Sequence, residues 1–187
     1  MKKALLSAAL VFGVLVSCKK SNNPAGGVTN FDSQHLTCAI DGVATSFNAN
    51  LMATRTTTTT PTYPYTQIAI TGYAGTSGSN IPGLGIGWSN TSANVTFGTG
   101  TWIDTSSKYA IFGIYAPIST DTWDAGTAVW QTTLGTSNKI TNDLVLTITY
   151  MDSTGVKGTF SGEFFDGGLV SAAKKVITNG DFVVRWK

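Results

Sequence analysis

The chain has 187 residues and a formal net charge of +2, and its 12% of charged residues is about half the usual share. One histidine and two cysteines are too few for a standard zinc site, and the lack of a basic cluster argues against nucleic acid as a partner. Threonine, serine, glycine and asparagine supply most of the polarity, which favours strands over helices.

The N-terminus has the pattern of a lipoprotein signal peptide, predicted over residues 1–17. Lys2 and Lys3 precede an apolar run, Ala4 to Val16, that is too short for a membrane span and typical of a secretory signal. Leu15-Val16-Ser17-Cys18 is a lipobox, which predicts cleavage before Cys18 and its lipidation. The alternative is an ordinary signal peptide with an incidental cysteine. Cleavage would remove two lysines and leave ten basic and ten acidic residues.

Residues 18–33 are predicted to be the lipidated cysteine and a flexible tether. Asn22-Asn23-Pro24 and Gly26-Gly27 lie here, and the segment has too little apolar content to fold. A single domain is expected from Gln34 to Lys187, a length that can bury a sizeable core.

Beyond Gln34, short alternating segments separated by turn residues predict an all-β domain. Asp41-Gly42 predicts a type I′ hairpin. Roughly ten strands at this spacing favour an antiparallel β-sandwich, with a barrel as the alternative. The predicted strands are His35–Ile40, Val43–Asn48, Tyr65–Tyr73, Gly83–Trp88, Val95–Ile103, Lys108–Ala116, Thr127–Thr133, Leu144–Tyr150, Val156–Phe165 and a last strand with Phe182, Val184 and Trp186 on its core face.

Three stretches are predicted to be loops. Arg55–Pro64 is rich in threonine and proline, Ala74–Pro82 in glycine and serine, and Pro117–Gly126 carries two aspartates and a tryptophan. Cys38 alternates with Leu36 and Ile40, so we expect a buried, inert thiol; a reactive or dimer-forming thiol is the alternative.

Residue types suited to catalysis are sparse, and we expect no enzyme activity, no catalytic residue and no cofactor. The single histidine, His35, opens the first predicted strand, where an exposed or capping role is expected. Glycoside cleavage would need a carboxylate pair, either Glu163 with Asp166 or Asp121 with Asp124. Asp121 and Asp124 could instead offer oxygens to Ca²⁺ or simply shape their loop.

Aromatic residues are the one suggestive excess. Trp102, Trp130 and Trp186 fall on predicted strands and are expected to be buried or half-buried. Tyr63, Tyr65 and Trp123 lie in or beside predicted loops, and exposed rings flanked by polar groups suit the binding of a sugar. The alternative is that these three rings fold back as lids over the ends of the domain.

Several segments resemble uncharacterised lipoproteins of Bacteroidota. They are the junction Val16-Ser17-Cys18-Lys19-Lys20, the early Asp41-Gly42 hairpin followed by Phe47, Gly98-Thr99-Gly100-Thr101-Trp102, and the segments Val156–Gly162 and Val176–Phe182. The resemblance implies a β-sandwich on a lipid anchor and carries no established activity. Surface-exported members of the group often have acidic residues after the cysteine. Lys19-Lys20-Ser21-Asn22-Asn23 has none, so we expect an outer-membrane protein that faces the periplasm.

Asp152-Ser153-Thr154 resembles the O-glycosylation signal of exported proteins in this group, with Ser153 as the predicted site. It lies in a predicted turn, where a sugar would cost no packing. The alternative is a plain turn in which Asp152 caps its own backbone and Gly155 takes a positive φ.

Together these features predict a lipid-anchored envelope binding module, with Tyr63, Tyr65 and Trp123 as the ligand site for a glycan. The alternative is a structural or accessory lipoprotein that docks onto a partner protein through a strand edge or an apolar sheet face.

Overall fold

The computed structural model describes residues 31–59, 64–77, 80–90, 95–103, 108–126, 144–167 and 173–187. Within these ranges every regular element is a β-strand, and no helix is long and apolar enough to cross a membrane. The strands are β1 (His35–Ile40), β2 (Val43–Ser46), β3 (Ala49–Thr59), β4 (Pro64–Tyr73), β5 (Gly83–Asn90), β6 (Gly100–Ile103), β7 (Tyr109–Ile118), β8 (Asp121–Gly126), β9 (Leu144–Met151), β10 (Gly155–Asp166) and β11 (Lys174–Arg185).

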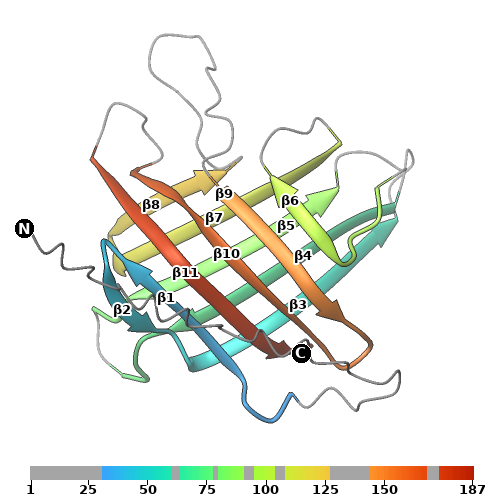
Figure 1. The fold of residues 1–187 in the computed structure, drawn as a ribbon, viewed down its shortest axis with the longest axis horizontal. Coiled ribbons are helices and arrows are strands. Elements are labelled where there is room, and N and C mark those ends of the chain that lie inside the picture. The colour runs from blue at the N-terminus through green and yellow to red at the C-terminus, as the bar shows by residue number, and fades with distance from the viewer. Residues whose placement is uncertain are drawn as a thin grey trace, which may run out of the picture.

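All the described strands belong to one antiparallel sheet that curls strongly on itself, like half of a barrel (Figure 1). Its order is β2-β1-β11-β10-β8-β7-β5-β4-β3, with β9 and β6 branching from β10. β10 connects the two layers of the sheet. Its first part pairs with β9, whereas Phe165 and Asp166 near its end pair with β8. The expected all-β, antiparallel class is confirmed, and both layers come from a single hydrogen-bonded sheet.

Two layers result, and their strands cross steeply in Figure 1. The front layer contains β2, β1, β11, β10, β9 and β6, and the back layer contains β8, β7, β5, β4 and β3. The free end of the back layer meets the front layer at a seam. There Ala53 of β3 forms an isolated parallel bridge with Trp186, and the Lys187 N–H donates to the Ala53 carbonyl over 2.9 Å.

The core lies between the two layers and follows the period-2 alternation of the strands. Leu144, Leu146 and Ile148 on β9 are at most 1% exposed, and Phe182 and Val184 on β11 are fully buried, as predicted. Trp186 is half-buried against this core. At one end of the core a cluster of rings joins β5, β6 and β7, with neighbouring centroids 5.0–6.4 Å apart; its members are Trp88, Phe97, Trp102 and Tyr109.

Two of the predicted loops were wrong. Arg55–Thr59 belongs to strand β3, because a run of β-branched threonines favours an extended strand. Of the prolines that suggested a loop, Pro64 is the first residue of β4, a position where the missing N–H costs little.

The second wrong loop is Pro117–Gly126. β7 continues through Pro117 to Ile118, and Asp121–Gly126 forms strand β8 of the same hairpin. The register shifts between Tyr115 and Ile118, and such an irregularity is where a proline can sit inside a sheet.

Other local predictions agree with the structure more closely. Asp41 and Gly42 have φ values of 50° and 83°, which confirms the type I′ turn. Of the predicted strand Val95–Ile103, only Gly100–Ile103 is a strand. Cys18, Tyr63, Trp130 and the predicted strand Thr127–Thr133 lie outside the described residues.

Candidate functional site

The predicted ligand residues Tyr65 and Trp123 lie far apart. Trp123 on β8 shares a row across the back layer with Tyr115, Leu84 and Gly72. Tyr65 is seven positions from Gly72 along β4, roughly 23 Å at the rise of a strand. Tyr65 and Trp123 therefore do not form one aromatic surface, and Tyr63 lies outside the described residues.

Trp123 is a strand residue rather than the exposed loop residue that was predicted. Its ring is half-buried against the core, and the ammonium of Lys175 lies 4.7 Å from the ring centroid. Its indole N–H donates to the Asp121 carboxylate over 3.3 Å. The ring therefore helps to hold β8 on β11.

Two of the carboxylates considered for catalysis or calcium, Glu163 and Asp121, contact other side chains. Glu163 pairs with Lys174 over 2.7 Å, and both side chains are exposed. Burial raises the pKa of Asp124, whereas Asp121 is engaged by Trp123. Within the described ranges no group of three or more histidine, cysteine, aspartate or glutamate side chains could hold a metal ion.

Asp152 organises the turn that carries Ser153. Its carboxylate accepts from the backbone N–H groups of Thr154 over 2.7 Å and Gly155 over 3.1 Å, which lowers its pKa, and from the Tyr150 hydroxyl over 2.9 Å. Ser153 is exposed. Gly155 does not have the positive φ that was predicted; an added Cβ would lie 2.5 Å from the Val184 carbonyl, so this glycine serves close packing.

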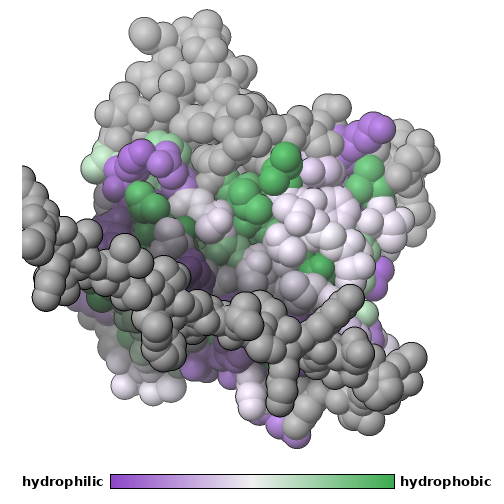
Figure 2. All heavy atoms as spheres, in the orientation of Figure 1, coloured by the Kyte–Doolittle hydropathy of each residue, from purple (hydrophilic) through white to green (hydrophobic). Residues whose placement is uncertain are grey.

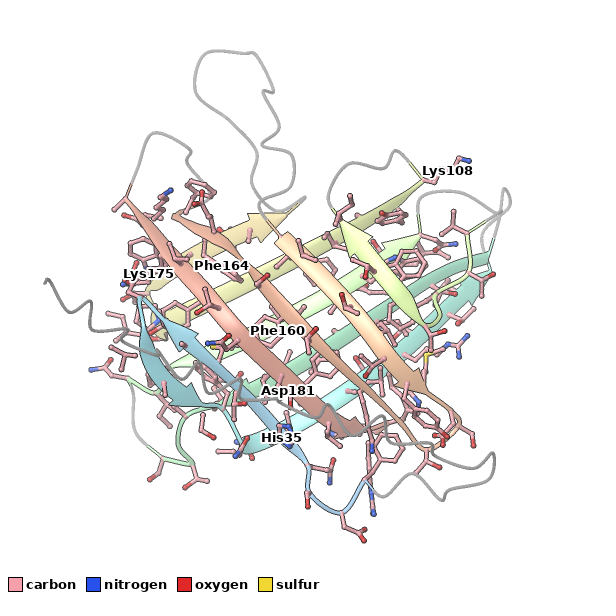
Figure 3. All side chains as sticks on the ribbon, in the orientation of Figure 1. His35, Lys108, Phe160, Phe164, Lys175 and Asp181 are labelled. Atoms are coloured by element: carbon pink, nitrogen blue, oxygen red, sulfur yellow. The ribbon has the colours of Figure 1, made fainter. Side chains whose placement is uncertain are left out.

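Cys38 and His35, two ionisable residues of β1, are engaged in the packing and hydrogen bonding of the domain. Cys38 is 5% exposed, as expected, and burial raises the pKa of its thiol to about 11. His35 is partly exposed; its Nδ1 hydrogen-bonds the Ser33 carbonyl over 2.9 Å, and its Nε2 contacts the Asp181 carboxylate (Figure 3).

A depression lies at the seam between β3 and the end of β11. We call it the seam pocket. Its volume is about 560 Å³, within the usual range of ligand sites. It is lined by Gln34, Asn50, Leu51, Met52, Tyr73, Arg185, Trp186 and Lys187.

Tyr73 is the exposed ring of this pocket. It is 43% exposed, and it lies on the outer face of β4 because Ile70 and Ile68, three and five positions before it, point inward and residues an odd number apart face opposite sides of a strand. The ring covers the backbone of Gly83, where an added Cβ would be 3.1 Å from the tyrosine Cε1. This contact fixes one side of the ring and leaves the other side available to a ligand.

Leu51 and Met52 supply apolar wall, and several other lining residues are polar and held by hydrogen bonds or an ion pair. Asn50 has a φ of 50° at the irregular start of β3, where the pairing with β4 shifts register. The Arg185 N–H donates to the Gln34 side-chain oxygen over 3.0 Å, and the Arg185 guanidinium pairs with Asp32 over 2.6 Å. The Trp186 indole N–H donates to the Asp152 carbonyl over 2.8 Å, which fixes the second ring.

Sequence reasoning missed this pocket. It placed Tyr73 on a strand and Trp186 on the core face, and it gave no role to Asn50 or Arg185. The alternation of Ile68 and Ile70 already indicates that Tyr73 points outward. No local pattern indicates that the end of β11 lies beside it.

Comparisons of the chain with protein-family models, with curated proteins and with solved structures find no match.

Proposed function

We propose that the protein is a lipid-anchored, non-catalytic binding module of the cell envelope that takes a carbohydrate ligand in the seam pocket. The observation that carries the proposal is the combination of an exposed aromatic ring, Tyr73, with amide and guanidinium side chains in one depression of about 560 Å³. The two layers of the curled sheet serve as a sandwich-like scaffold for this pocket.

The chemistry of the lining residues suits a sugar. The C–H face of a pyranose ring packs on an aromatic ring, and its hydroxyls need polar partners at the edge. Tyr73 supplies the ring, and Asn50, Gln34 and Arg185 line the same depression with donors and acceptors. This site replaces the combination of Tyr63, Tyr65 and Trp123, whose two described members are separated along the back layer.

The anchor completes the proposal. Cys18 would carry the lipid, and residues 19–30 would link the membrane to the described domain. The neutral, weakly charged mature chain supports attachment through acyl chains rather than through a basic surface. Outer-membrane attachment with the domain facing the periplasm stays our expectation.

The test compares two tyrosines of β4 by isothermal titration with neutral envelope and plant oligosaccharides. Tyr73→Ala should weaken binding about five- to tenfold, the equivalent of one stacked ring. Tyr65→Ala is the matched control, because Tyr65 lies on the same outer face eight positions away. Loss of binding only in Tyr65→Ala would place the site at the end predicted from sequence, and a folded wild type that binds no oligosaccharide would contradict the proposal.

Partner docking is the second candidate, and the outer face of the back layer favours it. Ile114 and Ile118 on β7 are 42% and 37% exposed. The facing positions of β5 are Gly83, Gly85 and Gly87, so the surface between β4 and β7 carries little polarity. A shallow apolar depression of about 230 Å³ lies there. Such a face on an antiparallel sheet is typical of contact with an apolar protein surface.

A photo-crosslinker separates the two candidates. Placed at position 114 in cells, it should yield one discrete protein adduct if docking is the function, whereas position 149 on the front layer should yield none. Absence of an adduct at position 114, together with oligosaccharide binding in solution, would leave the carbohydrate function.

A further inference from the structure

A second depression opens on the outer face of the front layer, over β9, β10 and β11. Its volume is about 380 Å³. Thr147, Thr159, Ser161, Asn179 and Asp181 supply its polar lining. Figure 2 shows pale, weakly polar side chains gathered on this side of the molecule over β6 and β9, and Figure 3 places Asp181 on the same face.

Irregular strands open this depression. The pairing of β10 with β11 shifts register between Phe160 and Gly162, and that of β1 with β11 shifts between Thr37 and Ala39. Asn179 has a φ of 52° at this point. Such bulges bend a strand and re-aim its side chains, which here leaves Asn179 at the wall of the depression.

A row of polar side chains, five with a hydroxyl group and one with a carboxylate, runs across the front layer at right angles to the strands and passes through the depression. Its pairs follow directly from the strand register, and the hydroxyls of Thr101 and Thr147 lie 3.1 Å apart. In order across the sheet, the row consists of Thr101, Thr147, Thr159, Asp181, Thr37 and Ser46. With neighbouring strands about 4.8 Å apart, its six side chains span roughly 24 Å.

The row is connected to the seam pocket along β11. Asp181, Val183 and Arg185 alternate onto the same outer face, and Arg185 lines the seam pocket. His35 and Gln34 run alongside on the neighbouring segment; His35 contacts Asp181, and Gln34 contacts Arg185. The path from Asp181 to Arg185 is about 13 Å long.

We infer that the protein binds an extended, uncharged oligosaccharide chain that runs from the seam pocket along β11 to Asp181 and from there across the strands through the front depression, over Thr159 and Thr147. The inference rests on the proposed function and specifies its ligand as a polymer of several sugar units rather than a mono- or disaccharide. Repeated hydroxyls at the spacing of the strands offer a donor or an acceptor to each successive sugar ring. Adjacent strands are rotated by about 20°, so the row winds and fits a flexible chain rather than a flat crystalline surface.

The charge of the front depression favours a neutral chain in that part of the path, whereas Arg185 and Lys187 line the seam pocket. Asp181 is the one charged residue that lines the front depression, and its carboxylate contacts His35. An acidic sugar would meet this carboxylate at close range and be repelled. A uronic acid at the end of the chain that lies in the front depression should therefore weaken binding relative to a neutral sugar unit at that position.

The experiment measures affinity against ligand length, from disaccharide to hexasaccharide, by isothermal titration. Wild type should bind the longer chains more tightly. Thr159→Val removes one hydroxyl of the row while keeping a β-branched side chain, and it should lower the affinity for hexasaccharide about fivefold without changing that for disaccharide. Thr149→Val is the matched control, because Thr149 is exposed on β9 but does not line the depression.

The outcomes separate the two proposals. Affinity that is independent of length in wild type, with binding still lost in Tyr73→Ala, would overturn the inference and leave the seam pocket as the whole site. Equal effects of Thr159→Val and Thr149→Val would also overturn it. Absence of binding at every length would overturn the proposed function and the inference together.

Discussion

His35 is the residue whose protonation couples most directly to the fold. Both ring nitrogens face acceptors, the Ser33 carbonyl and the Asp181 carboxylate, which suits the doubly protonated ring. Partial burial and the charge of Lys157 lower the pKa of His35, but the hydrogen bonds to Asp181 and Ser33 and the charge of Asp181 outweigh them. The pKa of His35 is therefore raised above its ordinary value.

The raised pKa gives a pH-dependent stability. The contribution of the protonated ring is fully present below the pKa of the unfolded chain, about 6.5, and is lost as pH rises through the higher folded value. His35→Gln should therefore lower the free energy of unfolding at about pH 5, by less than about 1 kcal/mol for so exposed a pair, and have a smaller effect at about pH 9. Urea unfolding at both pH values measures this, and a larger effect at high pH would contradict the assignment.

A second prediction compares two glycines of β5, Gly87 and Gly85, which differ in the space available for an added Cβ atom. An alanine Cβ at Gly87 would lie 2.1 Å from the ring of Phe112 and 2.8 Å from the Ile68 carbonyl. At Gly85 the nearest atom is the Thr71 methyl at 3.5 Å. Gly87→Ala should cost about 1–3 kcal/mol of stability through strain, whereas Gly85→Ala should be neutral or stabilise by up to about 1 kcal/mol.

Denaturant midpoints of the two variants provide the measurement. Equal midpoints would show that Phe112 moves aside at little cost, contrary to the packing of the back layer.

At the scale of elements, β8 depends on Trp123. The ring packs against the core from one side and under the Lys175 ammonium from the other. Trp123→Ala should lower the free energy of unfolding by about 2–3 kcal/mol, less than for a fully buried tryptophan. Lys175→Ala, which removes the cation over the ring and its ion pair with Asp41, should cost no more than about 1 kcal/mol. Thermal unfolding checks both, and an unchanged melting temperature for Trp123→Ala would mean that the ring is in solvent.

β3 and β8 show where reasoning about single elements fails. The threonine run of β3 was predicted to be a loop because prolines follow it. In the structure, Thr54 to Thr58 pair residue by residue with Ala69 to Tyr65 of β4. The segment of β8 was predicted to be a loop because of its two aspartates, which are depleted in strands, although its pairing with β7 and β10 makes it a strand. In β3 the pairing with β4 adds to the strand propensity of threonine, and in β8 the two partner strands decide the conformation.

For the whole molecule, the decisive prediction concerns attachment. Cys18→Ala should release the protein from membranes, because stable residence needs the acyl chains that the lipobox would direct to this cysteine. Cell fractionation with intact-mass analysis measures it. A wild-type mature chain that is recovered from membranes without added lipid mass would contradict the anchor.

Orientation is tested on the same cells. Protease treatment of intact cells should leave the protein uncut if it faces the periplasm. Ready cleavage between Lys19 and Asn30 would place the domain on the cell surface instead.

The sequence by itself determines the class of this domain and much of its local structure. Alternation of apolar and polar residues identifies β1, β4, β9 and β10 and their inward faces, because side chains of a strand point to opposite sides in turn. Asp41-Gly42 identifies its hairpin, because both residues tolerate positive φ. The burial of Cys38 follows from the same alternation.

Only the tertiary structure decides which strands meet and where ligand residues gather. An apolar face can pack against any other apolar face, so alternation does not specify the order of strands or the curl of the sheet. The seam pocket joins Asn50 and Tyr73 to Arg185 and Trp186, which are more than 110 positions later in the chain. Their proximity depends on the bridge between Ala53 and Trp186 and on the irregular turn of backbone at Asn50, neither of which leaves a periodic signal in the sequence.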